Sequence, residues 1–507
     1  MINITFVYPN FESLGVEYLM AICKKNGHGV SFIYYDAEDA YLDKKKQFSS
    51  NSIVEDIIKT RPHVVCFSCV TDNYRYQINI AKSLKKNYPK FITIFGGVHP
   101  TALPGKVLSN KEVDCVAIGE AEISLIEFLN NCQCHDNLSL PSNAVKGIVF
   151  KKKGKIIGNL EMGDHYANLD ELPYADKELF TSQAKDRSYL YKVITSRGCP
   201  YKCSYCFNSF YWSSGGKSIL RQRSVTNVLG ELKEAKAKIG LKYVLFLDDC
   251  FTTNTSWLLD FCRRYKNEIN VPFSCTTNPQ YIDSAKAKAL SEAGCVNIQI
   301  GIQSLSEDLC NNILHRKSDN SKIVTVIKDL KDANIMVQVD HMLGIPEDTI
   351  KQQEKSVIFY NKHRPSIISI FWLTYYPKTT ILDHALSKGI LQESEIAIIE
   401  DGRRIGNESY LAGGDMKNPG RYYSLAFIMG WLPLLPKFFV NFLIYSRLYQ
   451  VFRIKNYYLA IALPRAIYAT FNRKDIKGRE HIFHFIQQLN MLPRPWRTAV
   501  QKILSAL

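Results

Sequence analysis

Hydrophobic and polar stretches alternate along the first 135 residues, and the alternation predicts five strands separated by helices. The strands are expected at Ile2–Val7, Val30–Tyr35, Val64–Val70, Phe91–Phe95 and Cys115–Ile118. Between them lie stretches with apolar residues at helical spacing, such as Leu14–Lys25 and Tyr74–Asn87. This order is typical of a doubly wound parallel sheet, which binds ligands beyond the carboxyl ends of its strands. We therefore expect an α/β, Rossmann-like domain over residues 1–135.

A shorter pattern predicts a hairpin and a linker over residues 136–185. Gly147–Phe150 and Lys155–Gly158 are apolar enough for two strands, and the basic run Lys151–Gly154 between them suits a turn. The linker ends with Asn168–Pro173 before the next domain begins.

The alternation resumes over residues 186–385, where it predicts six more strands. They are expected at Val193–Thr195, Tyr243–Leu247, Phe273–Thr276, Val296–Ile302, Met336–Met342 and Ile368–Thr374. After the first strand, apolar residues from Val225 to Ile239 mark one helix face, and Ser224 is a candidate N-cap. Six strand–helix units predict a partial (β/α)6 barrel, whose chemistry would lie where the strands end.

Residues 386–507 change character and predict a mostly helical region. Leu425–Tyr445 is strongly apolar, but Pro433, Pro436 and Lys437 interrupt it. A bilayer needs about 20 uninterrupted apolar residues, so we do not expect a spanning helix. A helical cap over the barrel is the main interpretation, and peripheral contact with a membrane is the alternative. The second interpretation rests on basic residues that accompany aromatic ones: Arg447, Arg453, Lys455, Arg465, Arg473 and Lys474.

Composition restricts the partners and the compartment. The chain has 507 residues, 46% of them hydrophobic, and a net charge of +16, which suits nucleic acid, an anionic membrane or acidic partners. No basic stripe interleaved with aromatic residues is visible, so nucleic acid is not expected. The first residues predict a strand rather than a signal peptide, and most of the 14 cysteines suit a reducing cytoplasm.

Three cysteines in the stretch Ser196–Cys206 carry the strongest chemical signal. Cys199, Cys203 and Cys206 have the spacing Cys-x3-Cys-x2-Cys, directly after the first strand predicted for the barrel. Thiolates select iron–sulfur clusters or zinc. A four-iron cluster bound by three thiolates keeps one iron open to another molecule. Structural zinc sites are usually closed by a further Cys or His pair, which does not follow here, although zinc remains an alternative.

This loop resembles the signature of the radical S-adenosylmethionine (SAM) enzymes. The resemblance implies that Cys199, Cys203 and Cys206 bind a 4Fe-4S cluster whose open iron chelates SAM, which is then cleaved to a 5′-deoxyadenosyl radical. Further SAM contacts are implied at the ends of later strands, in segments similar to those of the family. Gln303 stands where a Glu is usual, so it keeps the hydrogen-bonding geometry and loses the charge. The implied SAM-binding residues are Tyr205, Asp248, Gln303, Ser304 and Gly344.

The first domain resembles the cobalamin-binding domain that is fused to radical SAM domains. The spacing from Ser68-x-Val70 to Gly96-Gly97, the loop Gly96–Pro104 and the turn Gly119–Glu122 carry this resemblance. The Asp-x-His-x-x-Gly element that supplies a lower ligand to cobalt in other cobalamin enzymes is absent, so no protein histidine is expected in that role. The implied cobalamin-binding residues are Ser68, Val70, Thr71, Gly96, Gly97, His99, Gly119 and Glu120, with His99 as a polar contact.

Together these resemblances imply a cobalamin-binding radical SAM enzyme, most often a methyltransferase acting on an unactivated carbon. Oxidative ring formation or rearrangement without methyl transfer is the alternative within the class, and a noncatalytic metal-binding protein is the alternative outside it. We expect a small-molecule or lipid-like substrate and a flavodoxin- or ferredoxin-type electron donor. The expected location is the cytoplasm, with the inner membrane surface as a variant.

Overall fold

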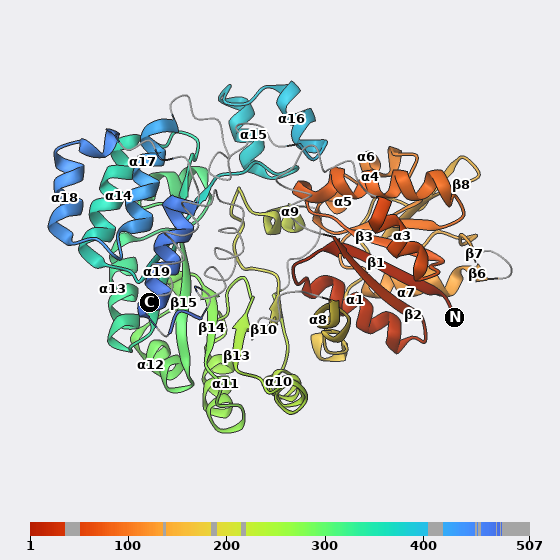
Figure 1. Ribbon diagram of the computed structural model, residues 1–507, viewed down its shortest axis with the longest axis horizontal. Coiled ribbons are helices and arrows are strands. Elements are labelled where there is room, and N and C mark those ends of the chain that lie inside the picture. The colour runs from red at the N-terminus through yellow and green to blue at the C-terminus, as the bar shows by residue number, and fades with distance from the viewer. Residues whose placement is uncertain are drawn as a thin grey trace, which may run out of the picture. The chain divides into compact units, whose positions relative to one another are not determined.

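The computed structural model divides into two compact units (Figure 1). It describes residues 1–35, 51–134, 138–183, 190–213, 220–403, 419–451, 454, 458–472, 474–476 and 478. The first unit comprises Met1–Arg187, Cys206–Arg223 and Tyr376–Ile405. The second, which we call the barrel unit, comprises Ser188–Tyr205, Ser224–Tyr375 and Gly406–Leu507.

The first unit contains a seven-stranded sheet in the order β2-β1-β3-β4-β5-β8-β9. Its parallel strands are β1 (Asn3–Pro9), β2 (Gly29–Tyr35), β3 (Val64–Ser68), β4 (Ile92–Gly96) and β5 (Cys115–Ala117). This order is that of a doubly wound fold, as predicted. The predicted hairpin is also present as β8 (Ile148–Lys152) and β9 (Lys155–Ile157), and β8 extends the sheet antiparallel to β5.

Helices cover both faces of this sheet because its central strands are apolar on both sides. On one face, buried side chains of α1 (Leu14–Lys25) and α7 (Glu122–Asn131), including Met20 and Phe128, pack against the strands. On the other face, α3 (Asn51–Lys59), α4 (Thr71–Asn87) and α6 (Pro104–Ser109) contribute side chains such as Leu84. The short helix α5 (Val98–Ala102) follows β4 directly.

The barrel unit contains six parallel strands in the order β10-β13-β14-β15-β16-β17. They are β10 (Leu190–Val193), β13 (Tyr243–Phe246), β14 (Phe273–Thr277), β15 (Cys295–Gln303), β16 (Met336–Leu343) and β17 (Ile367–Trp372). The helices between them are α10 (Val225–Ile239), α11 (Thr255–Glu268), α12 (Ser284–Glu292), α13 (Asn320–Asp332) and α14 (Ile350–His363). The sheet has two edges, β10 and β17, so the predicted partial barrel is confirmed.

Alternating side chains give the barrel strands one apolar and one polar face. Val337 and Val339 of β16 belong to the core shared with the helices. On the opposite face, Gln338 Nε2 donates to Ser369 Oγ at 2.8 Å, and Gln299 Nε2 donates to the Asp340 carboxylate at 2.9 Å. These hydrogen bonds help the face opposite the helices to carry polar side chains that are largely buried.

The described part of residues 386–507 is mostly helical, as expected. Helices α15 (Thr380–Ser387) and α16 (Glu393–Glu400) belong to the first unit. Helices α17 (Pro419–Trp431), α18 (Lys437–Tyr445) and α19 (Leu463–Phe471), with the short η6 (Tyr458–Ala462), belong to the barrel unit, where α17 lies against β17 and α14. Within the described ranges, no helix combines the length and the apolar composition that crossing a membrane requires.

Candidate active site

The cysteine loop follows the carboxyl end of β10, the first strand of the barrel. The strand was predicted at Val193–Thr195, but it ends at Val193 because Thr195 makes other hydrogen bonds. Its backbone N–H and hydroxyl both donate to the Asp248 carboxylate, which follows β13, and the Ser196 hydroxyl donates to the same group at 2.5 Å. Asp248 is 2% exposed, and burial raises its pKa against the opposing effect of these bonds. Its carboxylate therefore fixes the start of the loop, and direct contact with SAM stays a prediction.

A second set of contacts holds the middle of the loop. The Ser204 backbone N–H donates to the Leu314 carbonyl at 2.9 Å, and its hydroxyl donates to the Ile313 carbonyl at 2.6 Å. The turn that contains these carbonyls continues to Arg316. The loop and this turn are thus joined side by side within the barrel unit.

Arg316 is a site residue that the sequence did not reveal, because it lies outside every recognisable motif. Its Nη1 lies 3.6 Å from Cys203 Sγ, and its Nη2 donates to the Gly301 carbonyl at 2.5 Å. The guanidinium also lies 5.6 Å from the centroid of the Tyr201 ring. Burial lowers the pKa of Arg316, but Tyr205 and Cys203 outweigh it and raise the pKa above its usual value. A permanent positive charge therefore stands beside one thiol of the loop.

The three cysteines differ in their surroundings. Cys203 is buried, whereas Cys199 and Cys206 are half-buried. Burial raises the pKa of Cys199 to about 12, so this thiol must lose its proton when it binds a metal. The Cys206 carbonyl accepts from the Ser209 backbone N–H at 3.0 Å, at the start of α9 (Phe207–Ser213).

These residues fit an iron–sulfur cluster by their chemistry rather than by a preformed geometry. Across the described ranges, no group of three or more His, Cys, Asp or Glu side chains is arranged to hold a metal ion. Thiolates are nevertheless the ligands of iron–sulfur clusters, and hydrogen bonds and charges near the sulfur atoms tune such clusters. Arg316 beside Cys203 provides both.

The other predicted SAM-binding residues lie at the ends of neighbouring strands. Gln303 is the last residue of β15, where the pairing with β16 shifts register, and it has a φ of 70°. Ser304 follows and is 1% exposed. Gly344 follows β16 with a φ of 76°, a conformation that favours glycine. The strand ends therefore gather these residues at the same end of the barrel as the cysteine loop, while their contacts with SAM stay predictions.

In the first unit, the predicted cobalamin-binding residues also lie where parallel strands end. Ser68 ends β3, Thr71 begins α4, and Gly96 ends β4. Two of the loops approach closely: the Cys69 backbone N–H donates to the Gly96 carbonyl at 2.7 Å. A Cβ at Gly97 would lie 2.7 Å from the Cys69 carbonyl oxygen, so only glycine fits there. Val70 precedes α4 as its N-cap, and Gly119 and Glu120 follow β5.

His99 sits at the centre of these loops. Its Nδ1 lies 3.1 Å from Thr71 Oγ1, and its buried Nε2 has no hydrogen-bond partner. Burial, with a smaller contribution from Lys106, lowers the pKa of His99 to about 4, so the imidazole is neutral at neutral pH. A buried ring nitrogen without a partner is an available contact for a ligand. Glu120, by contrast, already forms an ion pair with Arg221.

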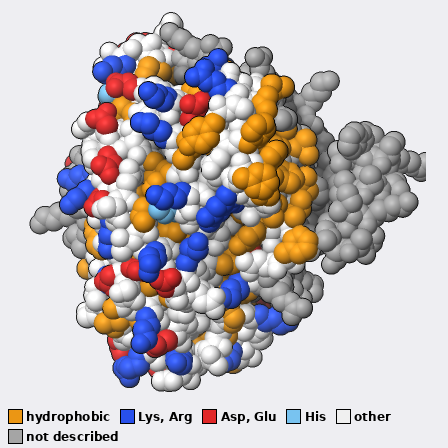
Figure 2. Space-filling model, turned by 90° about the vertical axis from the view of Figure 1, so that its left-hand side faces the viewer, with side chains coloured by type: hydrophobic (Ala, Val, Ile, Leu, Met, Phe, Trp, Pro, Cys, Tyr) orange, Lys and Arg blue, Asp and Glu red, His pale blue; other side chains and the backbone are white. Residues whose placement is uncertain are grey.

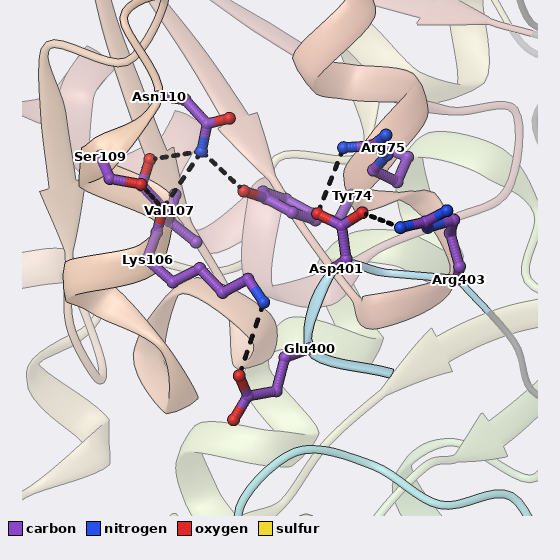
Figure 3. A network of polar contacts seen from close by, with 9 residues as sticks. All are labelled: Tyr74, Arg75, Lys106, Val107, Ser109, Asn110, Glu400, Asp401 and Arg403. Carbon is purple, nitrogen blue, oxygen red and sulfur yellow. Dashed lines mark hydrogen bonds and ion pairs between the residues drawn. The ribbon is translucent and has the colours of Figure 1, made fainter. Parts of the chain in front are cut away.

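A segment far along the chain completes this part of the first unit (Figure 3). After α16, the Asp401 carboxylate accepts from Arg75 Nη1 at 3.2 Å and pairs with Arg403 at 2.9 Å. Glu400 pairs with Lys106 at 3.5 Å. A Cβ at Gly402 would lie 3.0 Å from the Thr71 carbonyl oxygen. Residues 400–403 therefore pack against the start of α4, an arrangement that no sequence pattern predicted.

Comparison with known proteins finds a matching family for each of the two domains. The B12 binding domain model matches residues 2–129, and the Radical SAM superfamily model matches residues 193–359. An uncharacterized methyltransferase of Pyrococcus horikoshii is 25% identical over 382 residues, covering 75% of this chain and 79% of that protein. The anaerobic magnesium-protoporphyrin IX monomethyl ester cyclase of Cereibacter sphaeroides is 21% identical, covering 74% of this chain and 62% of that protein.

A solved structure shares the fold of the chain. The cobalamin-dependent SAM radical enzyme OxsB, with aqua-cobalamin bound, has a TM-score of 0.66 at 14% identity, covering 100% of this chain and 81% of that one. The chain belongs to the cobalamin-binding radical SAM enzymes, as the cysteine loop and the glycine loops predicted. The cofactors of this family are a 4Fe-4S cluster, SAM and cobalamin.

Replacing Arg316 by Gln should lower the reduction potential of the reconstituted cluster. The glutamine keeps a hydrogen-bond donor but removes a buried charge next to Cys203, which otherwise stabilises the more negative, reduced cluster. A decrease on the order of 100 mV is expected, since a unit charge a few ångström away is worth a few kcal/mol inside a protein. A redox titration followed by EPR measures it, with the exposed Arg263→Gln as the control. An unchanged potential in Arg316→Gln would contradict the assignment.

Replacing Gly402 by Ala should weaken cobalamin binding about fivefold while the iron content stays normal. Gly402 has a φ of 71°, where alanine is strained by about 1 kcal/mol, and its Cβ would also press on Tyr74 and Thr71. Gly389→Ala is a matched control, because Gly389 has a φ of 65° and nothing within 4 Å of its Cβ. Titration of the visible corrinoid spectrum compares the two variants. Equal affinities would show that residues 400–403 do not support the cobalamin loops.

Proposed function

We propose that the protein is a cobalamin-dependent radical SAM methyltransferase that acts on an unactivated carbon of a small-molecule or lipid-like intermediate. The loop of Cys199, Cys203 and Cys206 at the end of β10, with Arg316 beside Cys203, carries the proposal. The seven-stranded sheet of the first unit, with its glycine loops, would bind cobalamin. When bound, the cluster, SAM and cobalamin would supply an electron, a carbon radical and a methyl group.

Different residues of the protein have different roles in this proposed reaction. The three cysteines would hold the cluster, and Asp248 positions their loop through Thr195 and Ser196. Tyr205, Gln303, Ser304 and Gly344 would contact SAM. Ser68, Val70, Thr71, Gly96, Gly97, His99, Gly119 and Glu120 would surround the corrin. A flavodoxin- or ferredoxin-type protein would supply the electron.

Two other functions remain to be separated by experiment. The similarity to an anaerobic cyclase favours oxidative ring formation without methyl transfer as the second candidate. A noncatalytic metal-binding protein is the third, and metal analysis distinguishes it directly. A cluster would bring about four irons per chain, whereas a zinc site would bring one zinc.

Replacing Cys203 by Ala should abolish formation of 5′-deoxyadenosine from SAM, at least a hundredfold below the wild-type rate, because the cluster loses a ligand. Cys132→Ala is the control, since this half-buried cysteine caps the end of helix α7 and is not part of the cysteine loop. The measurement uses anaerobically reconstituted protein, cobalamin and SAM with a deuterated methyl group. Normal cleavage by Cys203→Ala would contradict the cluster assignment.

The same experiment distinguishes the two reaction types. A product that carries the deuterated methyl group, formed together with S-adenosylhomocysteine, supports methyl transfer. Formation of 5′-deoxyadenosine with an unmethylated, oxidised product would instead support the cyclase.

We also propose that the barrel unit contacts an anionic membrane through one face of α18. Phe438, Phe442 and Tyr445 are 75%, 54% and 71% exposed, and their spacing places them on one side of the helix. Val440, Leu443 and Ile444 of the same helix are buried, so α18 carries apolar side chains on both its buried and its exposed side. Figure 2 shows hydrophobic side chains gathered beside Lys and Arg side chains on the side of the molecule that carries α18.

The charges near this face suit anionic lipid. Residues 419–451 contain Arg421, Lys437 and Arg447 but no Asp or Glu. The adjacent helix α14 adds the exposed Lys351 and Lys355. Aromatic side chains with basic neighbours are typical of helices that lie in a membrane interface, where each basic residue adds about 1 kcal/mol of attraction. The proposed location is thus the cytoplasmic side of a membrane.

Replacing Phe438, Phe442 and Tyr445 together by Ser should weaken binding to phosphatidylglycerol-containing vesicles at least tenfold. Burying even part of each aromatic ring in the membrane interface contributes about 1 kcal/mol or more to the binding free energy. The control replaces Ile156, Leu160 and Ile239, which are 65%, 58% and 64% exposed elsewhere, by Ser. Vesicle sedimentation at low and high salt gives the affinities, and salt should weaken wild-type binding. Equal binding by both triple variants, or none by the wild type, would exclude this membrane face.

A further inference from the structure

A cavity of about 260 Å³ lies in the barrel unit beside its edge strand β17. The strand residues from Ile367 to Phe371 form one wall, together with Gln338 of β16. The opposite wall comes from the C-terminal helices, with Pro433, Ile461, Ala462 and Tyr468 among its residues. This space is distinct from the strand ends that gather the cysteine loop and the predicted SAM-binding residues.

Most of the wall is apolar, but two buried polar atoms in it have no partner. Gln338 is 6% exposed; its Nε2 donates to Ser369 Oγ at 2.8 Å, and its Oε1 is unpaired. The Arg465 side chain is 10% exposed, and its Nε is unpaired. Leaving a buried donor or acceptor unpaired costs about 1–3 kcal/mol. An acceptor and a donor that both line one cavity are therefore evidence for something polar inside it.

The charge of Arg465 is already balanced. Its Nη2 lies 2.7 Å from Asp475 Oδ1, and Asp475 is fully buried. The same Asp475 oxygen accepts from the Gly478 backbone N–H at 2.9 Å. The cavity therefore presents hydrogen-bonding groups without a net charge, so an anionic ligand would gain little in exchange for its lost hydration.

Size and polarity together define a ligand. A dry protein cavity of about 150 Å³ accommodates benzene, so about 260 Å³ suits roughly ten non-hydrogen atoms. A hydroxyl group can donate to Gln338 Oε1 or accept from Arg465 Nε–H, so it suits either unpaired atom. We propose that this cavity binds a neutral, mainly apolar alcohol, or the corresponding part of a larger lipid-like molecule. The proposal concerns binding alone and does not depend on methyl transfer.

Three small molecules of equal chain length test whether Gln338 Oε1 and Arg465 Nε contribute to binding. Octan-1-ol can donate and accept, 1-methoxyheptane can only accept, and octanoate is charged. Isothermal titration calorimetry with the reconstituted full chain should give the tightest binding for octan-1-ol. The ether should bind about fivefold to tenfold more weakly because it leaves Gln338 Oε1 unpaired. Gln338→Leu should remove this difference between alcohol and ether, a result that mere loss of packing would not produce.

Filling the cavity locates the binding. Ala462 lines the cavity, and Ala462→Leu should weaken binding of octan-1-ol at least tenfold. Ala237→Leu, on the exposed face of α10, is the matched control and should bind normally. The proposal is overturned if octan-1-ol does not bind up to its solubility limit, which would mean that water fills the cavity. Tighter binding of octanoate, or normal binding by Ala462→Leu, would overturn it as well.

Discussion

The hydrogen bonds that the Asp248 carboxylate accepts from Thr195 and Ser196 are the constraint on which the candidate active site depends. One of those donors, the Thr195 backbone N–H, is a group that would otherwise be available to continue strand β10 along β13. By binding them, Asp248 ends the strand at Val193 and turns the chain into the cysteine loop. A buried carboxylate is costly unless such donors surround it, so the end of the strand and the burial of Asp248 stabilise each other. The turn therefore sets where the cysteine loop begins.

The loop acquires its electrostatic character from a second, distant contact. Ser204 joins the loop to the turn at Ile313 and Leu314, and this turn places Arg316 beside Cys203. Arg316 also reaches the Gly301 carbonyl in β15, the strand that ends at Gln303. One guanidinium thus connects the cysteine loop with the strand whose end is proposed to bind SAM.

Periodicity predicted the fold well because both sheets are parallel and buried. Apolar runs between helical stretches located the five parallel strands of the first sheet and the six of the barrel, with errors of a few residues at their ends. Spacing also located the cysteine loop. Arg316 and Gly402 escaped prediction because their roles come from tertiary contacts and no local pattern marks them. The joining of β8 to β5 was missed for the same reason, since a hairpin pattern does not say which strand it will pair with.

The return of residues 376–405 to the first unit has a consequence for how the protein forms during synthesis. That unit is assembled from three separate stretches of chain, and the last of them follows the whole six-stranded sheet in sequence. Domains usually fold in the order in which the ribosome releases them. Here the N-terminal sheet can collapse early, but the ion pairs of Arg75 and Lys106 with Asp401 and Glu400 must await translation of residues about 300 positions further along the chain. The first unit would thus be completed only after the six-stranded sheet of the barrel unit has emerged, although the C-terminal helices of the barrel unit are still to follow.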